Sequence, residues 1–361
     1  MHAGPGGPGP YHAHVANIPA DEPTTVVELD EREVSGGAAE PRGYGYLAGV
    51  WLTVLAFGMV AFVWSHHVGV GFKDPGGRMF SGKITYSLTG LVIALVADAA
   101  WRWWRTPRER RSVRTTLRER WSLERLLLMV TGLTAYHLVY FFYRNLKSWD
   151  AFNNPRDDWL GDLDRRIFGE SPAVLLHDLL GTHTAAYVLM VVYKSFTYLT
   201  ALSVVITLVF SRTIRRGYVF LVAAMWTWIL GTASYYLIPS LGPFASAPQD
   251  FTRLPHTTIT DTWAEYLTQR QEFLADPTAP TSFVSISAFA SLHTGFTALA
   301  CFMAFYYGHK WLGSALGVYL VAIMVSTVYW GWHFTLDDVA GLVIAAVAVA
   351  IGHVTVRPLR T

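Results

Sequence analysis

The sequence predicts an all-α polytopic membrane protein with about eight transmembrane helices. Of its 361 residues, 52% are hydrophobic and only 15% are charged, which is far more apolar than a soluble domain. Runs of apolar residues long enough to cross a bilayer as helices lie at 46–65, 84–101, 126–143, 184–210, 218–238, 291–308, 312–331 and 337–355. The net charge of +2 is too small to indicate a nucleic-acid partner, so the membrane is the partner that the composition predicts.

The chain ahead of the first span has the composition of a disordered tail. Residues 1–44 combine a Gly/Pro-rich stretch with a polar one and show no apolar periodicity. No cleavable signal peptide is expected, because the first apolar run begins only near Tyr46. We therefore divide the chain into this tail, a part with two spans and an arginine-rich loop at 45–125, and a six-span part at 126–361.

Arginine-rich links between spans predict the orientation of the protein in the membrane. Nine arginines lie between Arg102 and Arg125, and the short link after the fourth span has Arg212, Arg215 and Arg216. Both links fall on the same side of an eight-span protein, and the positive-inside rule places them and both termini in the cytoplasm. We expect a multi-pass protein of the plasma membrane whose arginine-rich loop meets anionic lipid head groups.

Two long segments, 144–183 and 239–290, are then expected on the extracytoplasmic side. Within the first, apolar residues recur at helical spacing at Trp159, Leu160, Leu163 and Ile167. Within the second, the same pattern is formed by Trp263, Tyr266, Leu267, Phe273 and Leu274. Each pattern predicts a helix in the membrane interface, and the length of 239–290 leaves open whether this segment is a lid or an interface anchor.

Three polar residues at the ends of spans form the candidate site. His333 and Asp337 lie four residues apart, where the seventh apolar run stops and the eighth begins, so they share a face if the eighth run is helical. His293 opens the sixth run. The predicted topology brings all three to the extracytoplasmic face, where imidazoles beside a carboxylate can perform nucleophilic and acid–base chemistry.

Structural explanations exist for the same three residues. His333 and Asp337 would then be a helix-capping pair, and His293 would be a packing histidine. The three could also bind a metal ion, but no local ligand motif supports this, and we expect neither a metal nor another cofactor. His137 and His183 are expected to be buried or interfacial packing histidines, and Asp338 is expected to be a solvated neighbour or a supporting residue of the site.

The spacing of these residues is similar to that of a known family. Ser326, His333, Asp337 and Gly341 stand in the pattern Ser-x6-His-x3-Asp-x3-Gly, which resembles the third motif of the type 2 phosphatidic acid phosphatase superfamily. Ser291-Leu292-His293 resembles the second motif, in the order that the family uses. The resemblance covers roughly 126–355 and implies that the last six helices form a catalytic bundle of this type.

Departures from the usual motifs indicate a branch of that superfamily. Thr327 stands where the third motif usually has arginine, and the first motif, Lys-x6-Arg-Pro, is absent, because its register gives Tyr235 and Gly242-Pro243. Ser-Thr-x-Tyr together with Ser-Leu-His resembles the inositol-phosphorylceramide-synthase-like branch, the aureobasidin-target-like inositolphosphotransferases. The stretch 162–169 is similar to bacterial members of that branch, whose enzymes move a phosphorylated head group between lipids.

The resemblance implies a mechanism that needs no metal. His333 would attack phosphorus and form a phosphohistidine. Asp337 would hold the other ring N–H of His333, and His293 would protonate the leaving oxygen and then activate the acceptor as a base. Ser291, at the start of a helix, would hold phosphate oxygens.

The missing basic residues of the first motif leave the phosphate without its usual partners. Lys194, inside the fourth span, is a candidate replacement, with snorkelling or pairing with Asp98 as the alternatives. Outer-face candidates are the cations of Arg144, Arg253 and Arg270, which could instead face solvent or lipid head groups. Hydroxyl donors are offered by Tyr235, Tyr236 and Tyr329, which an aromatic interface belt would also explain.

The sequence therefore favours a phosphotransferase acting on lipids. Its substrates would be a phospholipid or polyprenyl phosphate and a lipid or alcohol acceptor. The first alternative is a lipid phosphate phosphatase that hydrolyses phosphatidic acid or a polyprenyl phosphate or diphosphate. A non-catalytic membrane protein or transporter on the same scaffold is the second alternative, because the first motif is lost.

Overall fold

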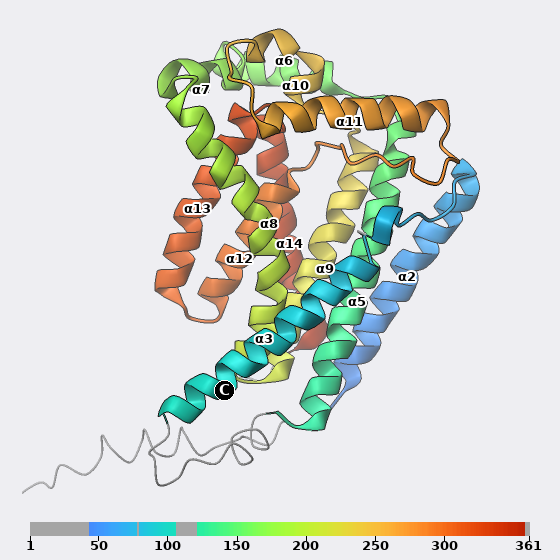
Figure 1. The fold of residues 1–361 in the computed structure, drawn as a ribbon, viewed down its shortest axis with the longest axis vertical. Coiled ribbons are helices and arrows are strands. Elements are labelled where there is room, and N and C mark those ends of the chain that lie inside the picture. Colours follow the sequence, from blue (N-terminus) through green and yellow to red (C-terminus); the bar gives the residue numbers. More distant parts are fainter. Residues whose placement is uncertain (1–42, 78, 106–120, 358–361) are drawn as a thin grey trace, which may run out of the picture. The chain divides into compact units, whose positions relative to one another are not determined.

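The computed structural model describes residues 43–77, 79–105 and 121–357 of the chain. Almost all of the predicted tail and most of the arginine-rich loop lie outside these residues. Within them every regular element is helical, as Figure 1 shows. The expectation of an all-α membrane protein is confirmed.

Among the residues that the structure describes, seven helices are long and apolar enough to cross a membrane. They are α2 (Gly45–Val68), α3 (Ser81–Arg105), α5 (Leu123–Trp149), α8 (Thr184–Phe210), α9 (Ile214–Leu237), α13 (Lys310–Tyr329) and α14 (Thr335–Val356). The remaining predicted span, the sixth in chain order, corresponds to α12 (Leu292–Tyr306), which has only 15 residues. Such a helix is about 22 Å long, shorter than the hydrocarbon core of about 30 Å. The start of α12 therefore lies inside the depth that the other helices cross.

A buried extended segment leads to this recessed start. Figure 1 shows it as a coil between α11 (Thr258–Ala275) and α12. Non-helical backbone is tolerated at membrane depth only when its polar groups find partners inside the protein. Val284 N donates to Ser148 Oγ at 2.9 Å, and Ala290 N donates to Ser234 Oγ at 2.9 Å. Further along, Ala288 N donates to the backbone oxygen of Ser240 at 2.8 Å. Oxygen atoms of serines on α5, on α9 and in the loop after α9 thus accept hydrogen bonds from the backbone of the segment, which allows it to be buried within the bundle.

Short helices cover the end of the bundle where α12, α13 and α14 meet. They are α6 (Asp157–Phe168), α7 (Pro172–Leu180) and α10 (Pro243–Ser246), with the single turns η3 (Asp150–Phe152) and η4 (Pro248–Phe251). A further single turn, η1 (Pro75–Gly77), lies between α2 and α3 along the chain. In Figure 1, α11 lies across this end of the bundle. The helices predicted within 144–183 and 239–290 are α6 and α11.

Two buried carboxylates fix α6 in place. Asp157 accepts hydrogen bonds from the backbone N–H groups of Leu241 and Gly242, at 3.0 and 2.7 Å. Asp164 accepts from Thr335 N at 3.2 Å, at the start of α14. Burial raises the pKa of both carboxyl groups, and these hydrogen bonds partly oppose the rise. The amphipathic pattern of α6 therefore includes acidic residues that hold the loops of the site.

The arginine link and the histidines lie at opposite ends of α14. Arg215, in the first turn of α9, donates to the backbone oxygen of Val356, the last residue of α14, at 2.9 Å. His333 comes just before the first residue of the same helix. A spanning helix therefore separates the two features, as the predicted topology requires.

The start of α12 packs closely against α14 at two glycines. A Cβ added to Gly341 would lie 2.4 Å from the backbone oxygen of Ser291 and 3.0 Å from the nitrogen of Gly295. Side chains at these positions would hold the two helices apart. The close approach of the two helices brings His293, in the first turn of α12, next to His333.

We predict that Gly341→Ala separates α12 from α14 and damages the site. The added methyl group meets backbone, which cannot rotate away, so the variant should lose about 1–3 kcal/mol of stability. Thermal unfolding of the purified protein in detergent measures this loss. Gly45→Ala is the matched control, because no atom lies within 4 Å of a Cβ at Gly45. An equal unfolding temperature for the two variants would contradict the packing argument.

Candidate active site

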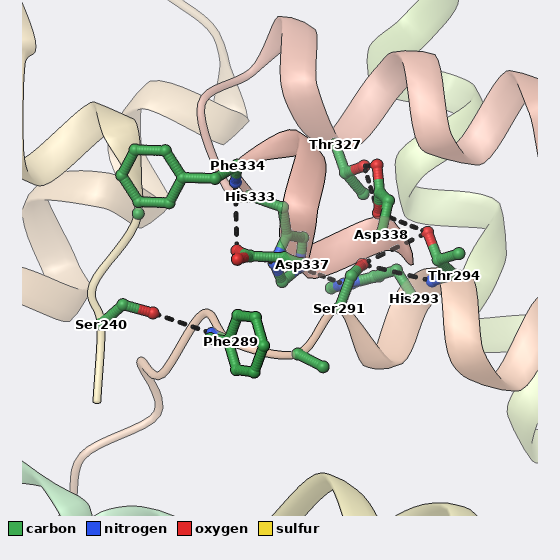
Figure 2. A network of polar contacts seen from close by, with 12 residues as sticks. Ser240, Phe289, Ser291, His293, Thr294, Thr327, His333, Phe334, Asp337 and Asp338 are labelled. Carbon is green, nitrogen blue, oxygen red and sulfur yellow. Dashed lines mark hydrogen bonds and ion pairs between the residues drawn. The ribbon is translucent and has the colours of Figure 1, made fainter. Parts of the chain in front are cut away.

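The structure brings His293, His333 and Asp337 together. Nδ1 of His293 lies 3.4 Å from Nε2 of His333. Nδ1 of His333 lies 3.2 Å from Oδ2 of Asp337. The ring of His333 therefore contacts a carboxylate through one nitrogen and a second imidazole through the other, an arrangement visible in Figure 2.

Asp337 links the starts of two helices. Its Oδ2 accepts a hydrogen bond from Phe334 N at 3.0 Å, and its backbone oxygen accepts from Ser291 N at 2.9 Å. The side chain is fully buried. Asp337 therefore fixes the His333 ring, the first turn of α14 and the entry to α12 together.

The arrangement keeps the His333 imidazole neutral. Burial lowers its pKa well below the ordinary value for histidine, and the nearby His293 and Lys147 lower it further. His333 is only 5% exposed. A neutral imidazole whose Nδ1–H is donated to Asp337 has a free lone pair on Nε2, the form that a nucleophile requires.

The geometry also bears on the metal alternative. Asp337 contacts one nitrogen of the His333 ring, and His293 faces the other. These two side chains therefore lie on opposite sides of the ring and do not converge on a common point. Across the ranges that the structure describes, no group of three His, Cys, Asp or Glu side chains is placed to hold a metal ion.

Asp338 is a buried network residue and does not lie in solvent. It is 2% exposed and accepts a hydrogen bond from Thr294 Oγ1 at 2.5 Å. Thr327 Oγ1 also donates to it, at 3.3 Å. Figure 2 shows these contacts joining α12, α13 and α14. Of the two roles expected for Asp338, the solvated one is wrong, because Thr294 and Thr327 surround the buried carboxylate, and the supporting role agrees with these contacts.

Ser291 caps α12. Its Oγ accepts from Thr294 N at 3.3 Å and lies 3.3 Å from Thr294 Oγ1, and its side chain is fully buried. It belongs to the network of Asp338. The structure thus gives Ser291 a contact set that positions the start of α12.

The residues ahead of His333 attach α13 to its neighbours. Ser326 Oγ donates to the backbone oxygen of Leu189 in α8 at 2.8 Å. Tyr329 Oη donates to the backbone oxygen of Gly181 at 2.9 Å, and the backbone oxygen of Tyr329 lies 2.9 Å from His177 Nε2. The Ser-Thr-x-Tyr stretch is therefore used for packing, and the Tyr329 hydroxyl is engaged there.

A cavity of about 720 Å³ opens beside the two histidines. It is lined by α3, α5, α8, α9, α11 and the buried segment before α12. Four cationic side chains line it, and none of the described lining residues is an aspartate or a glutamate. The cations belong to Lys83, Arg144, Lys147 and Lys194. A site of this charge favours an anionic ligand.

Arg144 is the cation with the strongest signs of a binding role. Its Nη2 donates to Ser285 Oγ at 3.1 Å, but its Nε is buried and has no hydrogen-bond partner among the described residues. Lys147, three residues further along α5, lies over the ring of Tyr235 with Nζ 5.2 Å from the centroid. Both side chains line the cavity, as does Tyr235. Together they place positive charge on the wall of the cavity that His293 and His333 also line.

Lys147 was not singled out from the sequence. It lies among interleaved acids and bases, and only its spacing of three from Arg144 marks it as sharing a helix face. Lys194 lines the cavity and donates to Thr258 Oγ1 on α11. It does not pair with Asp98, which instead accepts from Arg102 at 2.9 Å.

Three other candidate side chains contact parts of the protein away from the cavity. Tyr236 Oη donates to the backbone oxygen of Leu146 at 2.7 Å. Arg253 forms an ion pair with Asp178 at 2.7 Å, with about half of each side chain exposed. Arg270 donates to the backbone oxygen of Ala151 at 3.2 Å. Neither Tyr236, Arg253 nor Arg270 lines the cavity.

Aromatic side chains form the roof and walls beside the histidines. Tyr266 of α11 lines the cavity and packs on Trp332 with ring centroids 5.7 Å apart. Trp332 stacks on Tyr193 at 5.5 Å, and Tyr193 contacts the His293 ring at 4.6 Å. The segment predicted as a lid or an anchor therefore covers the cavity through α11.

Fold and site together define a multi-pass helical membrane protein with a histidine pair beside a cationic cavity. The sequence model described as the PAP2 superfamily matches residues 158–351, more than half of the chain. The chain belongs to this superfamily, which confirms the resemblance at that level. No match was found among curated proteins or among solved structures. Membership indicates lipid phosphatase or phosphotransferase activity on lipid phosphates in membranes.

We predict that Arg144→Met weakens catalysis strongly. A hydrogen bond to a charged group contributes about 1.5–3 kcal/mol, so kcat/KM should fall roughly 10- to 100-fold. Turnover of a short-chain phosphatidic acid by purified protein measures this. Arg253→Met is the matched control and should be close to wild type, because Arg253 is half exposed and lies outside the cavity. Equal activities of the two variants would remove Arg144 from the site.

Proposed function

We propose that this protein is an integral-membrane phosphotransferase that moves a phosphorylated head group between lipids through a phosphohistidine. One observation carries the proposal. The ring of His333 is held by Asp337 through Nδ1 and meets His293 through Nε2, on the wall of a cavity lined with cations. A nucleophile, its orienting carboxylate, an acid–base partner and charge for phosphate are thus adjacent.

The first half of the reaction forms the covalent intermediate. The lone pair of His333 Nε2 attacks phosphorus, an N–P bond forms, and the bond from phosphorus to the leaving oxygen breaks. Asp337 stabilises the positive charge that develops on the imidazole. His293 gives a proton to the leaving oxygen, which departs as an alcohol.

The second half reverses these roles. His293, now neutral, takes the proton of the acceptor hydroxyl, whose oxygen attacks phosphorus as the N–P bond breaks. Arg144 and Lys147 offset the charge on the phosphoryl oxygens in both halves. No metal enters these steps.

The proposed mechanism requires the rings of the two histidines to separate. A phosphoryl group does not fit between two nitrogens that lie 3.4 Å apart. His293 is the more exposed of the pair, and its ring contacts the rings of Tyr193 and Phe196 in tilted arrangements. We propose that the His293 ring moves past these aromatic rings when a substrate enters, and that His333 stays fixed by Asp337.

Transfer to an alcohol is favoured over hydrolysis by the setting of the site. The cavity lies within the helices, its roof is aromatic, and such a setting limits the access of water to the intermediate. The similarity of Ser-Thr-x-Tyr and Ser-Leu-His to the inositol-phosphorylceramide-synthase-like branch supports the same choice. The phosphatase alternative uses the same intermediate with water as the acceptor.

We also propose that the site faces the extracytoplasmic side of the plasma membrane. Arg212, Arg215 and Arg216 lie just before α9 and in its first turn, at the other end of α14. The arginine-rich segment 102–125 is expected on the same side of the membrane. The positive-inside rule then predicts that these arginines lie in the cytoplasm and the histidines outside.

The proposal is tested with phospholipids that carry a radiolabelled head-group phosphate and a panel of lipid alcohols as acceptors. Wild-type protein should produce labelled acceptor, and His333→Ala should produce none. His256→Ala is the control, because this histidine is highly exposed and lies outside the cavity. Free phosphate without acceptor dependence would show the phosphatase. Equal inactivity of wild type and His333→Ala would favour a non-catalytic role.

A second arm isolates the intermediate. A nitrophenyl phosphodiester has a leaving group that departs without a proton, so the first half no longer needs His293. His293→Ala should then accumulate label on the protein that is stable in alkali and lost in acid, and the additional change His333→Ala should abolish it. Label that persists without His333 would contradict its role as the nucleophile.

A further inference from the structure

The cavity continues beyond the histidines to a second polar cluster. Along α5, His137, Tyr140, Arg144 and Lys147 all line the cavity, at spacings that keep them on one face. His137 precedes Arg144 by seven residues, two turns or about 10 Å of helix. On the facing wall, α3 contributes Lys83 and Ser87. Both α3 and α5 lie outside the matched residues 158–351.

His137 is a buried histidine with one ring nitrogen that is not engaged in a hydrogen bond to the described residues. It is 4% exposed, and its Nε2 lies 2.8 Å from Ser87 Oγ. Its Nδ1 is buried and has no hydrogen-bond partner among the described residues, although the residue lines the cavity. Nδ1 is one of several buried polar atoms without a partner among the described residues, and it therefore has unused hydrogen-bonding capacity. Because His137 also lines the cavity, this nitrogen is a candidate contact for a ligand there.

Lys83 adds a charge that the reaction at His333 does not explain. The side chain is partly buried, lines the cavity, and lies close enough for its charge to affect His137. Charged side chains inside a membrane protein are rare and mark the sites of polar ligands. Arg144 and Lys147 already provide charge for a phosphate at His333. The cluster at Lys83 therefore suits a second anionic group.

The spacing shows that the second anionic group is separate from the first. The two phosphorus atoms of a diphosphate share one bridging oxygen, so such a group does not extend over two helical turns. A second lipid can, because the cavity reaches the outer surface between α3 and α8. Its lining there includes side chains that are largely exposed, Tyr86, Tyr198 and Leu202. Acyl chains can leave the cavity at this point while the head group stays inside.

We infer that Lys83, Ser87 and His137 form a second head-group site, which binds the phosphate of a phosphate-bearing lipid acceptor. The inference rests on the proposed function, since it names the second substrate of that transfer. Lys83 pairs with the phosphate, and His137 Nδ1 contacts a phosphate oxygen or hydroxyl. The acceptor hydroxyl then lies between this site and His333.

Lipid counting by native mass spectrometry tests the inference without turnover. The full chain carries His333→Ala, and the probes are dioctanoyl phosphatidic acid and dioctanoylglycerol, which has the same acyl chains without phosphate. We expect two bound phosphatidic acids per chain and a much weaker signal for the diacylglycerol. Adding Lys83→Met should leave one, and Lys83→Arg should retain two.

Controls separate the second site from folding and from catalysis. Lys310→Met removes an exposed lysine at the start of α13, outside the cavity, and should leave two lipids bound. Ser87→Ala frees Nε2 of His137 and should weaken the second lipid at least tenfold with little change in unfolding temperature. Two phosphatidic acids bound to Lys83→Met, as to Lys310→Met, would overturn the inference. The binding assay forms no product, so that result would leave the proposed transfer intact. Conversely, if two lipids bind but the transfer assay yields no labelled acceptor, only the proposed transfer is contradicted.

Discussion

The contact between the starts of α12 and α14 is the constraint on which the site depends. The amide of Ser291 donates to the backbone oxygen of Asp337, and the two helices approach closely at Gly295 and Gly341. This contact sets the depth of α12 and brings His293 to His333. Because α12 is short, the chain must reach it through an extended segment. The buried backbone N–H groups of that segment need hydrogen-bond acceptors, which serine side chains provide. A small set of backbone contacts thus positions two imidazoles.

Positive charge for a phosphate comes from a different part of the protein than the motifs do. The superfamily match begins at residue 158, whereas Arg144 and Lys147 lie on α5, ahead of it. Where the first motif would stand, Tyr235 lines the cavity under Lys147, and Gly242 binds Asp157 through its backbone. The loop supports α6, and α5 provides cations that line the cavity. In the proposed function, these cations would take the place of the basic residues of the absent first motif.

Much of the fold and the centre of the site could be predicted from the sequence. Apolar runs long enough to cross a bilayer located the spans, and the spacing of His333, Asp337 and Gly341 located the histidine site, because both are local patterns. The depth of α12 could not be predicted, because it depends on side chains from α5 and α9. The burial of Asp338 was missed for a similar reason, since Thr294 and Thr327 reach it from two other helices. Lys147 and the free nitrogen of His137 depend on which face of α5 meets the cavity, and that face is set by tertiary packing.

The most direct test of the account is an experimental structure of the protein with orthovanadate, an anion that takes the trigonal bipyramidal geometry of phosphoryl transfer. The account predicts vanadium bonded to Nε2 of His333, oxygens contacting Arg144 and Lys147, and the ring of His293 moved away to contact an apical oxygen. Asp337 should keep its contact with Nδ1 of His333. Vanadate bound elsewhere, or held without a bond to His333, would contradict the central claim that this imidazole is the nucleophile.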